Sequence, residues 1–207
     1  AKDGTVVEKA DDGWRRHTTD DGLIDKVRVV ICTSDGRVWA AGSHKGEAAT
    51  AEFDGTRWLR QSHPGMGKTV DYRSFHEGRN GMLYIGATAS VKNQAAVMML
   101  DPRSDPPRWE EVSGSARLTN AIDIAEDTGQ RLWTGGHALS VLAPDSTERI
   151  AFPELLRGAF IDAVEAGSDR GTVWVAARGR GIGAFDGKEW KQTTITDGLA
   201  SNAISDM

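Results

Sequence analysis

The stretch SHPGMGKT, residues 62–69, ends like a phosphate-binding loop. Such a loop has the pattern G-x-x-x-x-G-K-[ST], because its first glycine lets backbone N–H groups wrap the phosphates while its lysine reaches their outer oxygens. Gly67, Lys68 and Thr69 fit the end of the pattern, but Ser62 stands at its opening position. The mismatch argues against a nucleotide site.

Residue types used in acid–base and metal chemistry are scattered. The five histidines have neither the H-E-x-x-H pattern nor the short paired spacing of a metal site. His44 and His137 fall at matching points of two repeats and, with an acid such as Asp25, could form a base or a metal site. G-x-S-x-G is absent, and Cys32 ends an apolar strand, where a buried thiol is expected. We therefore expect no catalytic residue, no metal and no cofactor.

The composition is that of a globular chain. It has 207 residues, of which 39% are apolar, enough for a sizeable core, and no apolar run approaches the ~18 residues that span a bilayer. The net charge is −5 and both signs are interspersed, so there is no basic face for a phosphate backbone and nucleic acid is not an expected partner. One cysteine excludes an internal disulfide framework but is compatible with either redox compartment.

Four stretches share one plan, a turn followed by a strand. They read DGRVWAAG at 35–42, NGMLYIGA at 80–87, QRLWTGGH at 130–137 and RGTVWVAA at 170–177. Their aromatic anchors, Trp39, Tyr84, Trp133 and Trp174, recur every ~40 to 50 residues, which is the period of β-propeller blades built of four short strands. Because they recur with the fold, we assign the tryptophans to core or inter-blade packing.

The last full unit shows the four strands most clearly. We expect them at 160–166, 172–177, 181–186 and 190–195, separated by Gly- and Asp-containing turns such as SDRG and FDGKE. No apolar period of 3.6 residues persists for the length of a helix. The sequence therefore predicts an all-β chain, a β-propeller of four-stranded blades.

A second aromatic series, Trp14, Trp58, Trp109 and Trp190, follows turns and is out of phase with the first; Ile150 takes the remaining position. The chain reads WRRHTTDDGL from Trp14 and WKQTTITDGLASN from Trp190, and the first copy continues into an apolar strand and D-G-x-V-W. This pattern resembles the two-component regulator propeller repeat, strongly in the first and last units and weakly in the middle two. GMGKT then stands where other units carry D-G-L-x-x-N, as a blade-to-blade crossover before a strand, not before the helix that a phosphate loop requires.

We treat residues 1–207 as a single domain with about five blade equivalents. The units are 14–57, 58–108, 109–149 and 150–189, with 190–207 and 1–13 as a partial fifth blade. Joined end to end, AISDM and AKDGTVV keep the register of VVICTSDGRVW, with Gly4 at the place of Gly36 and Val7 at that of Trp39. The ends could pair in a closed small ring, which removes sheet edges. Alternatively, the chain is a fragment of a larger propeller, as the family's usual blade number favours.

Loops from all blades of a propeller meet around one mouth of the central channel. The candidate ligand-binding residues there are Asp25, Lys26, His44, Lys45, Lys68, Tyr72, Lys92, Asn93, Asn120, His137, Arg157, Arg178, Arg180 and Asn202. The simplest interpretation of the lysines and arginines is that they are solvated loop charges, and that of Asn120 and Asn202 is that they hydrogen-bond turn backbone. The RGRG run at 178–181 could clamp an anion or form a flexible hairpin.

The resemblance implies a non-catalytic sensor or interaction module for signal transduction. In that family the propeller lies in the periplasm or outside the cell and passes ligand occupancy to a separate signalling part. We expect a small polar ligand, with a saccharide as one candidate, or another protein as the partner; a membrane would be reached only through other parts of a parent chain, and a homo-oligomer is one expected state. Two alternatives remain: a lyase or hydrolase with a His and acid site at the mouth, and a structural propeller that docks another protein through an exposed apolar patch.

Overall fold

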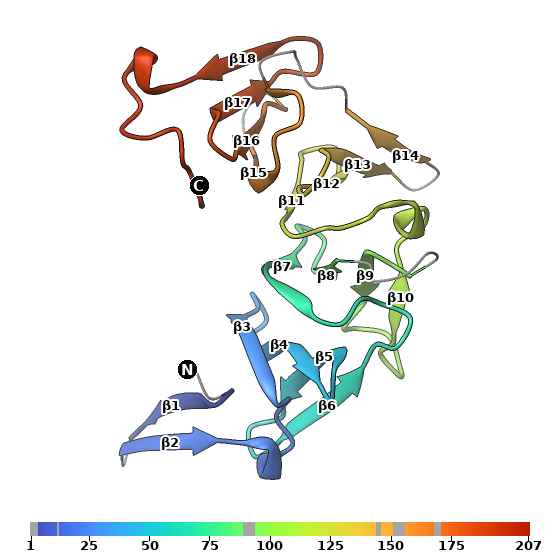
Figure 1. Cartoon of the computed structure of the whole chain (residues 1–207). Helices are drawn as coiled ribbons and strands as arrows, with labels where there is room; N and C mark the ends of the chain where they lie inside the picture. The colour runs from blue at the N-terminus through green and yellow to red at the C-terminus, as the bar shows by residue number, and fades with distance from the viewer. Residues whose placement is uncertain (1–3, 12, 89–93, 144–145, 151–155, 168–170) are drawn as a thin grey trace.

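The computed structural model describes residues 4–11, 13–88, 94–143, 146–150, 156–167 and 171–207. Nearly all regular structure in these ranges is antiparallel sheet, which confirms the predicted all-β class. Four four-stranded sheets and one two-stranded sheet follow one another along a curved path, with the N-terminal hairpin at one end and the C-terminal sheet at the other (Figure 1). The described chain thus forms an open arc of propeller blades with a concave side.

Each four-stranded sheet is one blade, with its strands in chain order. Blade 1 contains β3 (Lys26–Cys32), β4 (Val38–His44), β5 (Glu47–Phe53) and β6 (Trp58–Ser62). Blade 2 contains β7 (Val70–Glu77), β8 (Leu83–Ala87), β9 (Val97–Leu100) and β10 (Trp109–Glu111). Blade 3 contains β11 (Ile124–Glu126), β12 (Leu132–Thr134), β13 (Ser140–Ala143) and β14 (Ser146–Arg149). Blade 4 contains β15 (Ile161–Ala166), β16 (Val173–Ala177), β17 (Gly181–Phe185) and β18 (Trp190–Thr193). The first strands β3, β7, β11 and β15 contact one another in turn and lie along the concave side (Figure 1).

Short 3-10 turns follow the outermost strand of three sheets: η1 (Thr19–Asp21) follows β2, η2 (Ser115–Arg117) follows β10, and η4 (Ile195–Asp197) follows β18. The two stretches TTDDGL (18–23) and TITDGL (194–199) share the pattern T-x-x-D-G-L. In the first copy, Thr18 and Asp21 exchange side-chain and backbone hydrogen bonds in a capping box. Gly22 follows with a φ of 89°, in the left-handed region that favours glycine. The second copy, from Thr194 to Gly198, repeats this structure. The repeat motif is therefore a capped turn that follows the outermost strand of a sheet, and its first copy leads into blade 1.

The N-terminal hairpin of β1 (Val6–Ala10) and β2 (Gly13–His17) is the outer half of a blade. In three sheets, the tryptophan near the start of the last strand pairs with the residue five positions before it on the preceding strand. These pairs are Lys9 with Trp14, Phe53 with Trp58, and Phe185 with Trp190. Because the turn before each tryptophan has the same length, β1 matches a third strand. The predicted register, with Val7 at the second-strand place of Trp39, is therefore wrong.

The core lies between blades as well as within them. Trp39 in β4 of blade 1 is 2% exposed, and its ring centroid is 6.0 Å from that of Trp109 in blade 2. Tyr84 and Trp133, at the same place in blades 2 and 3, are buried in clusters that reach the following blade. The predicted inter-blade packing is confirmed for these three anchors. It is wrong for Trp174 in blade 4 and for Trp14 in the N-terminal hairpin, which are 42% and 72% exposed because no further blade covers them among the described residues.

The two ends of the arc do not meet. Within the described ranges β1 pairs with β2 alone, and residues 198–207 form no strand. The termini lie on either side of the opening in Figure 1. Of the two arrangements predicted for the ends, the closed small ring is therefore not the one that these residues adopt.

The stretch GMGKT lies just before β7, and Cys32 is the last residue of β3. Gly67 accepts a backbone hydrogen bond from Ala48, and Val70 opens strand β7, so the stretch is a blade crossover that precedes a strand, as predicted. Cys32 is exposed, and the prediction of a buried thiol is wrong. Exposed and half-buried residues alternate along β3, which puts Lys26, Arg28, Val30 and Cys32 on one exposed face.

Among the described residues, no helix has the length and apolar character needed to cross a membrane.

Candidate functional site

The innermost strands of three blades are interrupted along the concave side. Strand pairing shifts between Val27 and Val29 in β3, between Val70 and Phe75 in β7, and between Ile161 and Ala163 in β15. Bulges of this kind re-aim side chains and are common beside functional sites. The residues within the shifts are Arg28, Asp71, Tyr72, Arg73, Ser74 and Asp162. Ser74 is buried and its hydroxyl donates to the carbonyl of Gly86. The other residues are polar or aromatic groups on the first strands of three blades, and we call this concave side of the arc the wall.

Two arginines and two aromatic rings join blades 2 and 4; with Asp162 we call them the arginine–aromatic cluster (Tyr72, Arg73, Phe160, Asp162 and Arg178). The Arg73 guanidinium lies over the Tyr72 ring, 4.5 Å from its centroid, and donates to the Tyr72 hydroxyl. It also donates to the backbone carbonyl of Asp162. The Arg178 guanidinium lies 4.6 Å from the Phe160 centroid and donates from Nε to Oδ2 of Asp162 at 2.9 Å. One residue, Asp162, thus fixes both arginines.

The arginine–aromatic cluster is open to solvent. Tyr72 is 50% exposed, and the Arg178 side chain is 64% exposed. The hydrogen bonds that Arg178 donates to the Asp162 carboxylate raise the pKa of Arg178, which keeps the guanidinium charged. The ring of His137 meets the edge of Phe160, with centroids 5.0 Å apart. Such a surface can stack on a flat ring and can donate paired hydrogen bonds to a carboxylate.

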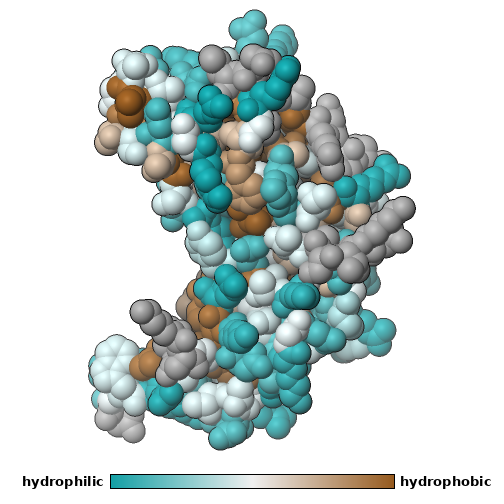
Figure 2. Space-filling view, in the orientation of Figure 1, coloured by the Kyte–Doolittle hydropathy of each residue, from teal (hydrophilic) through white to brown (hydrophobic). Residues whose placement is uncertain are grey.

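A hollow of about 510 Å³ lies farther along the wall, beside the crossover from blade 1 to blade 2. We call it the cationic hollow; among its lining residues are Lys26, Arg28, Ser43, Lys68 and Thr69. Asp71 connects it to the arginine–aromatic cluster, because its carboxyl group interacts with both Arg28 and Arg73. Burial raises the pKa of Asp71, and the two arginines oppose that shift. Figure 2 shows the molecule hollowed between its two ends, with hydrophilic and hydrophobic residues both at the edge.

The predicted residues of the first blade form a separate group. Asp25 accepts the backbone N–H of Lys45 at 2.9 Å and lies 3.6 Å from Nδ1 of His44. Arg60 contacts the His44 ring at 2.7 Å from Nε2, and burial together with Arg60 lowers the pKa of His44. His137 contacts Phe160 instead, so the two histidines belong to different groups. Within the part of the chain that the structure describes, no set of three or more His, Cys, Asp or Glu is arranged to hold a metal.

The other predicted site residues cap turns, are exposed in loops, or lie outside the described residues. Oδ1 of Asn120 accepts the N–H of His137, and Oδ1 of Asn202 accepts that of Ile195, so both asparagines cap turn backbone, as their simpler interpretation predicts. Arg157 and Arg180 are exposed in loops. Lys92 and Asn93 lie outside the described residues. The structure thus brings Tyr72, Arg178 and His137 together, and Lys26 with Lys68.

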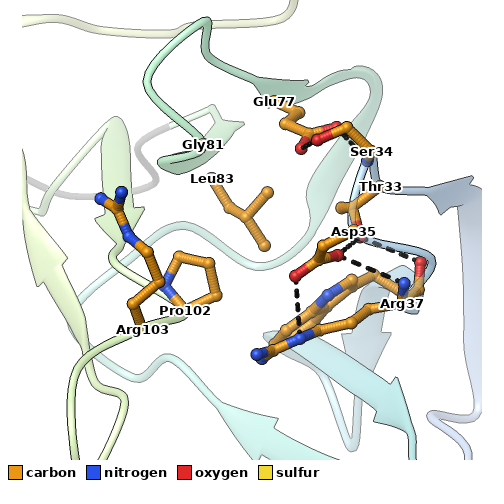
Figure 3. Close-up of a pocket in the computed structure, with 10 residues that line it drawn as sticks. Thr33, Ser34, Asp35, Arg37, Glu77, Gly81, Leu83, Pro102 and Arg103 are labelled. Atoms are coloured by element: carbon orange, nitrogen blue, oxygen red, sulfur yellow. Dashed lines mark hydrogen bonds and ion pairs between the residues drawn. The ribbon is translucent and has the colours of Figure 1, made fainter.

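A second hollow, of about 180 Å³, lies between blades 1 and 2 at the opposite end of β3 from Lys26 (Figure 3). Its carboxylates are already engaged. Glu77 accepts from the backbone N–H and the hydroxyl of Ser34 at 2.8 and 2.5 Å, and Asp35 pairs with Arg37 at 3.0 Å. Arg103, on the far side of the hollow in Figure 3, pairs with Asp101 outside it. We interpret this hollow as a hydrogen-bonded seam that fixes the two blades.

Asp123 lies in the wall next to the arginine–aromatic cluster. It is 8% exposed, its backbone bridges to Arg73, and its carboxylate accepts the N–H groups of Ile124 and Val164 at 2.9 and 2.8 Å. Burial raises its pKa to about 7 in spite of these hydrogen bonds. The folded chain therefore holds this proton more tightly than the unfolded chain does.

Asp123→Asn tests this pKa. The contribution of Asp123 to the free energy of unfolding is fully present below its unfolded pKa of ~4 and is lost as the pH rises from there through about 7. The asparagine cannot lose a proton. Between pH ~4 and about 7, the free energy of unfolding of the variant should therefore rise relative to that of the wild type by about 1.4 kcal/mol per pH unit. Urea unfolding of both proteins at several pH values measures the difference. A difference that stays constant with pH would contradict the buried, protonated carboxyl.

Comparison with known proteins supports the fold. No protein-family model and no curated protein matches the sequence. Among solved structures, PorZ, a surface component of the type-IX secretion system of Porphyromonas gingivalis, is 14% identical with a TM-score of 0.70 over 99% of this chain and 33% of that chain. The extracellular domain of a putative one-component system of B. thetaiotaomicron is 15% identical, with a TM-score of 0.65 over 99% of this chain and 27% of that one. A putative gluconolactonase is 14% identical, with a TM-score of 0.53 over 93% and 71%.

The chain spans 33% and 27% of the lengths of the first two structures, and at these identities the likeness bears on the fold. The repeats, the order of the strands in each blade and the course of the arc all agree with it. The chain is a β-propeller, with blades like those of the extracellular domain of a one-component regulator.

Proposed function

We propose that this propeller is the non-catalytic, ligand-binding part of a sensor, and that its concave wall binds a saccharide that carries a negative charge. The observation that carries the proposal is the arginine–aromatic cluster, in which Arg73 and Arg178, from separate blades, lie over aromatic rings and are held by one aspartate. The resemblance of the repeats to regulator propellers supports the role of a sensor.

The chemistry of the wall favours this class of ligand. Aromatic rings such as that of Tyr72, 50% exposed, offer an apolar face to the C–H face of a sugar. A guanidinium fork donates two parallel hydrogen bonds to a carboxylate or sulfate, which gives geometric selectivity as well as affinity. Lys26, Arg28 and Lys68 of the cationic hollow add a local positive field to a chain whose net charge is −5. An anionic saccharide could therefore contact the wall with its ring and its charged group together.

The arrangement suits binding better than catalysis. A general acid or base must be within reach of the proton that it moves and able to exchange it. The carboxylate of the cluster, Asp162, is instead engaged by Arg178, and His137 packs on Phe160. Because the wall joins blades 2 and 4, a ligand there would alter how these blades pack, which is a simple way to pass occupancy to another part of a receptor. By analogy with the extracellular regulator domain, we place this sensor outside the cytoplasm.

Calorimetric titration tests the proposal, with digalacturonate as the charged probe and galactobiose as the neutral one. We expect digalacturonate to bind more tightly, and Arg178→Ala to weaken its binding by about tenfold or more, because a hydrogen bond to a charged group contributes about 1.5–3 kcal/mol. The matched control is Arg103→Ala: the Arg103 side chain is 65% exposed and pairs with Asp101, but it lies at the other end of the blades. Equal effects of the two variants, or equal affinity for the two sugars, would contradict the proposal.

A further inference from the structure

The two arginines of the arginine–aromatic cluster are balanced by carboxyl groups in different ways. Arg178 forms a direct ion pair with Asp162, from Nε to Oδ2 at 2.9 Å. Arg73 instead donates to two neutral oxygens, a tyrosine hydroxyl and the backbone carbonyl of Asp162. Two further carboxyl groups, those of Asp71 and Asp123, interact with the charge of Arg73. The net charge around Arg73 therefore depends on whether Asp71 and Asp123 hold protons.

Asp123 lies where blades 2, 3 and 4 meet. Its backbone bridges to Arg73 of β7 in blade 2, and the N–H of Gly135, just after β12, donates to its carbonyl oxygen at 3.2 Å. Its carboxylate accepts the N–H of Val164 in β15 of blade 4 at 2.8 Å and that of the next residue in the chain at 2.9 Å. The charged groups that act on it are Arg73 and Asp206, the latter in the C-terminal segment. Because the residue is 8% exposed, two neutral donors and one cation stand in place of water around this carboxyl group.

These surroundings favour the protonated form of the carboxyl group up to unusually high pH. Burial disfavours the charged form, and this cost exceeds what the hydrogen bonds and Arg73 contribute, so the pKa of Asp123 is raised to about 7. Burial raises the pKa of Asp71 as well, against the charges of Arg28 and Arg73. Near neutral pH, Asp123 is therefore present in both forms, and each proton that it binds removes a negative charge beside Arg73.

An anion at Arg73 and a proton on Asp123 should each favour the binding of the other. An anion that accepts from the Arg73 guanidinium lies beside the Asp123 carboxyl group, where two negative charges repel one another. The anion therefore raises the affinity of Asp123 for a proton. Because coupling between two binding sites is reciprocal, the proton raises the affinity for the anion by the same factor.

We propose that Asp123 couples ligand binding at the arginine–aromatic cluster to protonation, so that the wall takes up a proton when it binds an anionic saccharide and releases the saccharide as the solution becomes alkaline. The inference rests on the proposed function, because it concerns the same ligand at the same site. Asp123 acts through Arg73 and does not itself contact the ligand. A sensor with this coupling responds to its ligand and to the acidity of its surroundings together.

Calorimetric titration with digalacturonate tests the coupling, because the heats of binding in two buffers of different ionisation enthalpy give the number of protons exchanged. The carboxylates of the probe are ionised above about pH 5 and do not contribute. Near pH 7.5 we expect wild-type protein to take up about half a proton for each digalacturonate bound. Between about pH 6 and 9 we expect the affinity to fall by about tenfold, which is a usual size for coupling between two sites.

Asp123→Asn removes the titrating group and leaves a side chain of the same size. The variant should bind digalacturonate with less proton uptake and a flatter pH dependence; His137, which contacts Phe160, is present in both proteins, so their difference reports on Asp123. The matched control is Glu126→Gln, at the other end of the same strand. Glu126 is 5% exposed, and its Oε2 accepts the N–H of Arg79 at 2.7 Å. This control should keep the wild-type uptake, and an equal loss in both variants, or a loss in neither, overturns the role of Asp123.

A titration of the free protein separates this inference from the proposed function. In wild-type protein without ligand, the Nε–H signal of Arg73 should shift with pH, with a midpoint at about 7, and Asp123→Asn should abolish the shift. A wild-type signal that does not respond across this window overturns the coupling, whether or not the sugar binds and even if the variant does not fold. Digalacturonate that binds without proton uptake also overturns the coupling but retains the proposed function.

Discussion

Trp39→Ala should lower the free energy of unfolding by about 3–5 kcal/mol, as is usual when a buried tryptophan is truncated. The side chain is 2% exposed and fills the seam between two blades, where it meets the rings of Phe75 and Trp109. The backbone around it belongs to two separate sheets, so it cannot collapse far into the space that is left. Equilibrium unfolding in urea, monitored by tryptophan fluorescence and by circular dichroism, gives the change.

Trp174→Ala is the matched control, since it is the same substitution at the same place in the last blade. Because 42% of the Trp174 side chain is exposed, its truncation should lower the free energy of unfolding by less than half as much as the truncation of Trp39 does. Equal losses for the two variants would mean that the junction between blades does not contribute what its packing indicates.

Gly67→Ala should lower the free energy of unfolding by about 3 kcal/mol or more, although it adds a single methyl group. A Cβ at this position would lie 2.0 Å from the carbonyl oxygen of Thr88 and 2.9 Å from its carbonyl carbon. Both atoms are backbone, so no flexible side chain can move aside. The crossover from blade 1 to blade 2 would have to shift away from the end of β8.

Gly65→Ala, two residues earlier in the same GMGKT stretch, is the control. A Cβ there would meet nothing within 4 Å, so the free energy of unfolding should change by less than about 0.5 kcal/mol. Urea unfolding of both variants makes the comparison. If the two substitutions cost the same, the close approach of Gly67 to Thr88 is not what fixes this crossover.

The blades could be predicted from the sequence because their signals are local. The alternation of apolar residues, the Gly and Asp turns and the repeated aromatic anchors each reflect a few neighbouring residues. The T-x-x-D-G-L motif is of the same kind, since the capping box of Thr18 and Asp21 and the left-handed Gly22 form within one turn. The register of β1 was harder, because the N-terminal hairpin lacks the first two strands with which the other blades can be aligned.

The candidate site could be predicted only in part, because long-range packing builds it. Tyr72, Arg178 and His137 were predicted as residues of the mouth, but Arg73, Phe160 and Asp162 were not. Arg73 and Asp162 lie within strands, at bulges that local sequence does not mark. The one available signal was the charge of Asp162 within the apolar run FIDAV. Exposure at the ends of the arc is likewise not local: Trp174 and Trp39 have similar surroundings in the sequence, and only the next blade distinguishes them.

The most direct test of the account is to observe the arginine side chains while a ligand binds. Isotope-labelled protein titrated with digalacturonate should show shifts of the Nε–H signals of Arg73 and Arg178, because both guanidinium groups lie in the arginine–aromatic cluster. The signal of Arg103, paired with Asp101 at the opposite end of the blades, should stay in place. If digalacturonate leaves Arg73 and Arg178 unchanged, or shifts Arg103 instead, the concave wall is not the binding site proposed here.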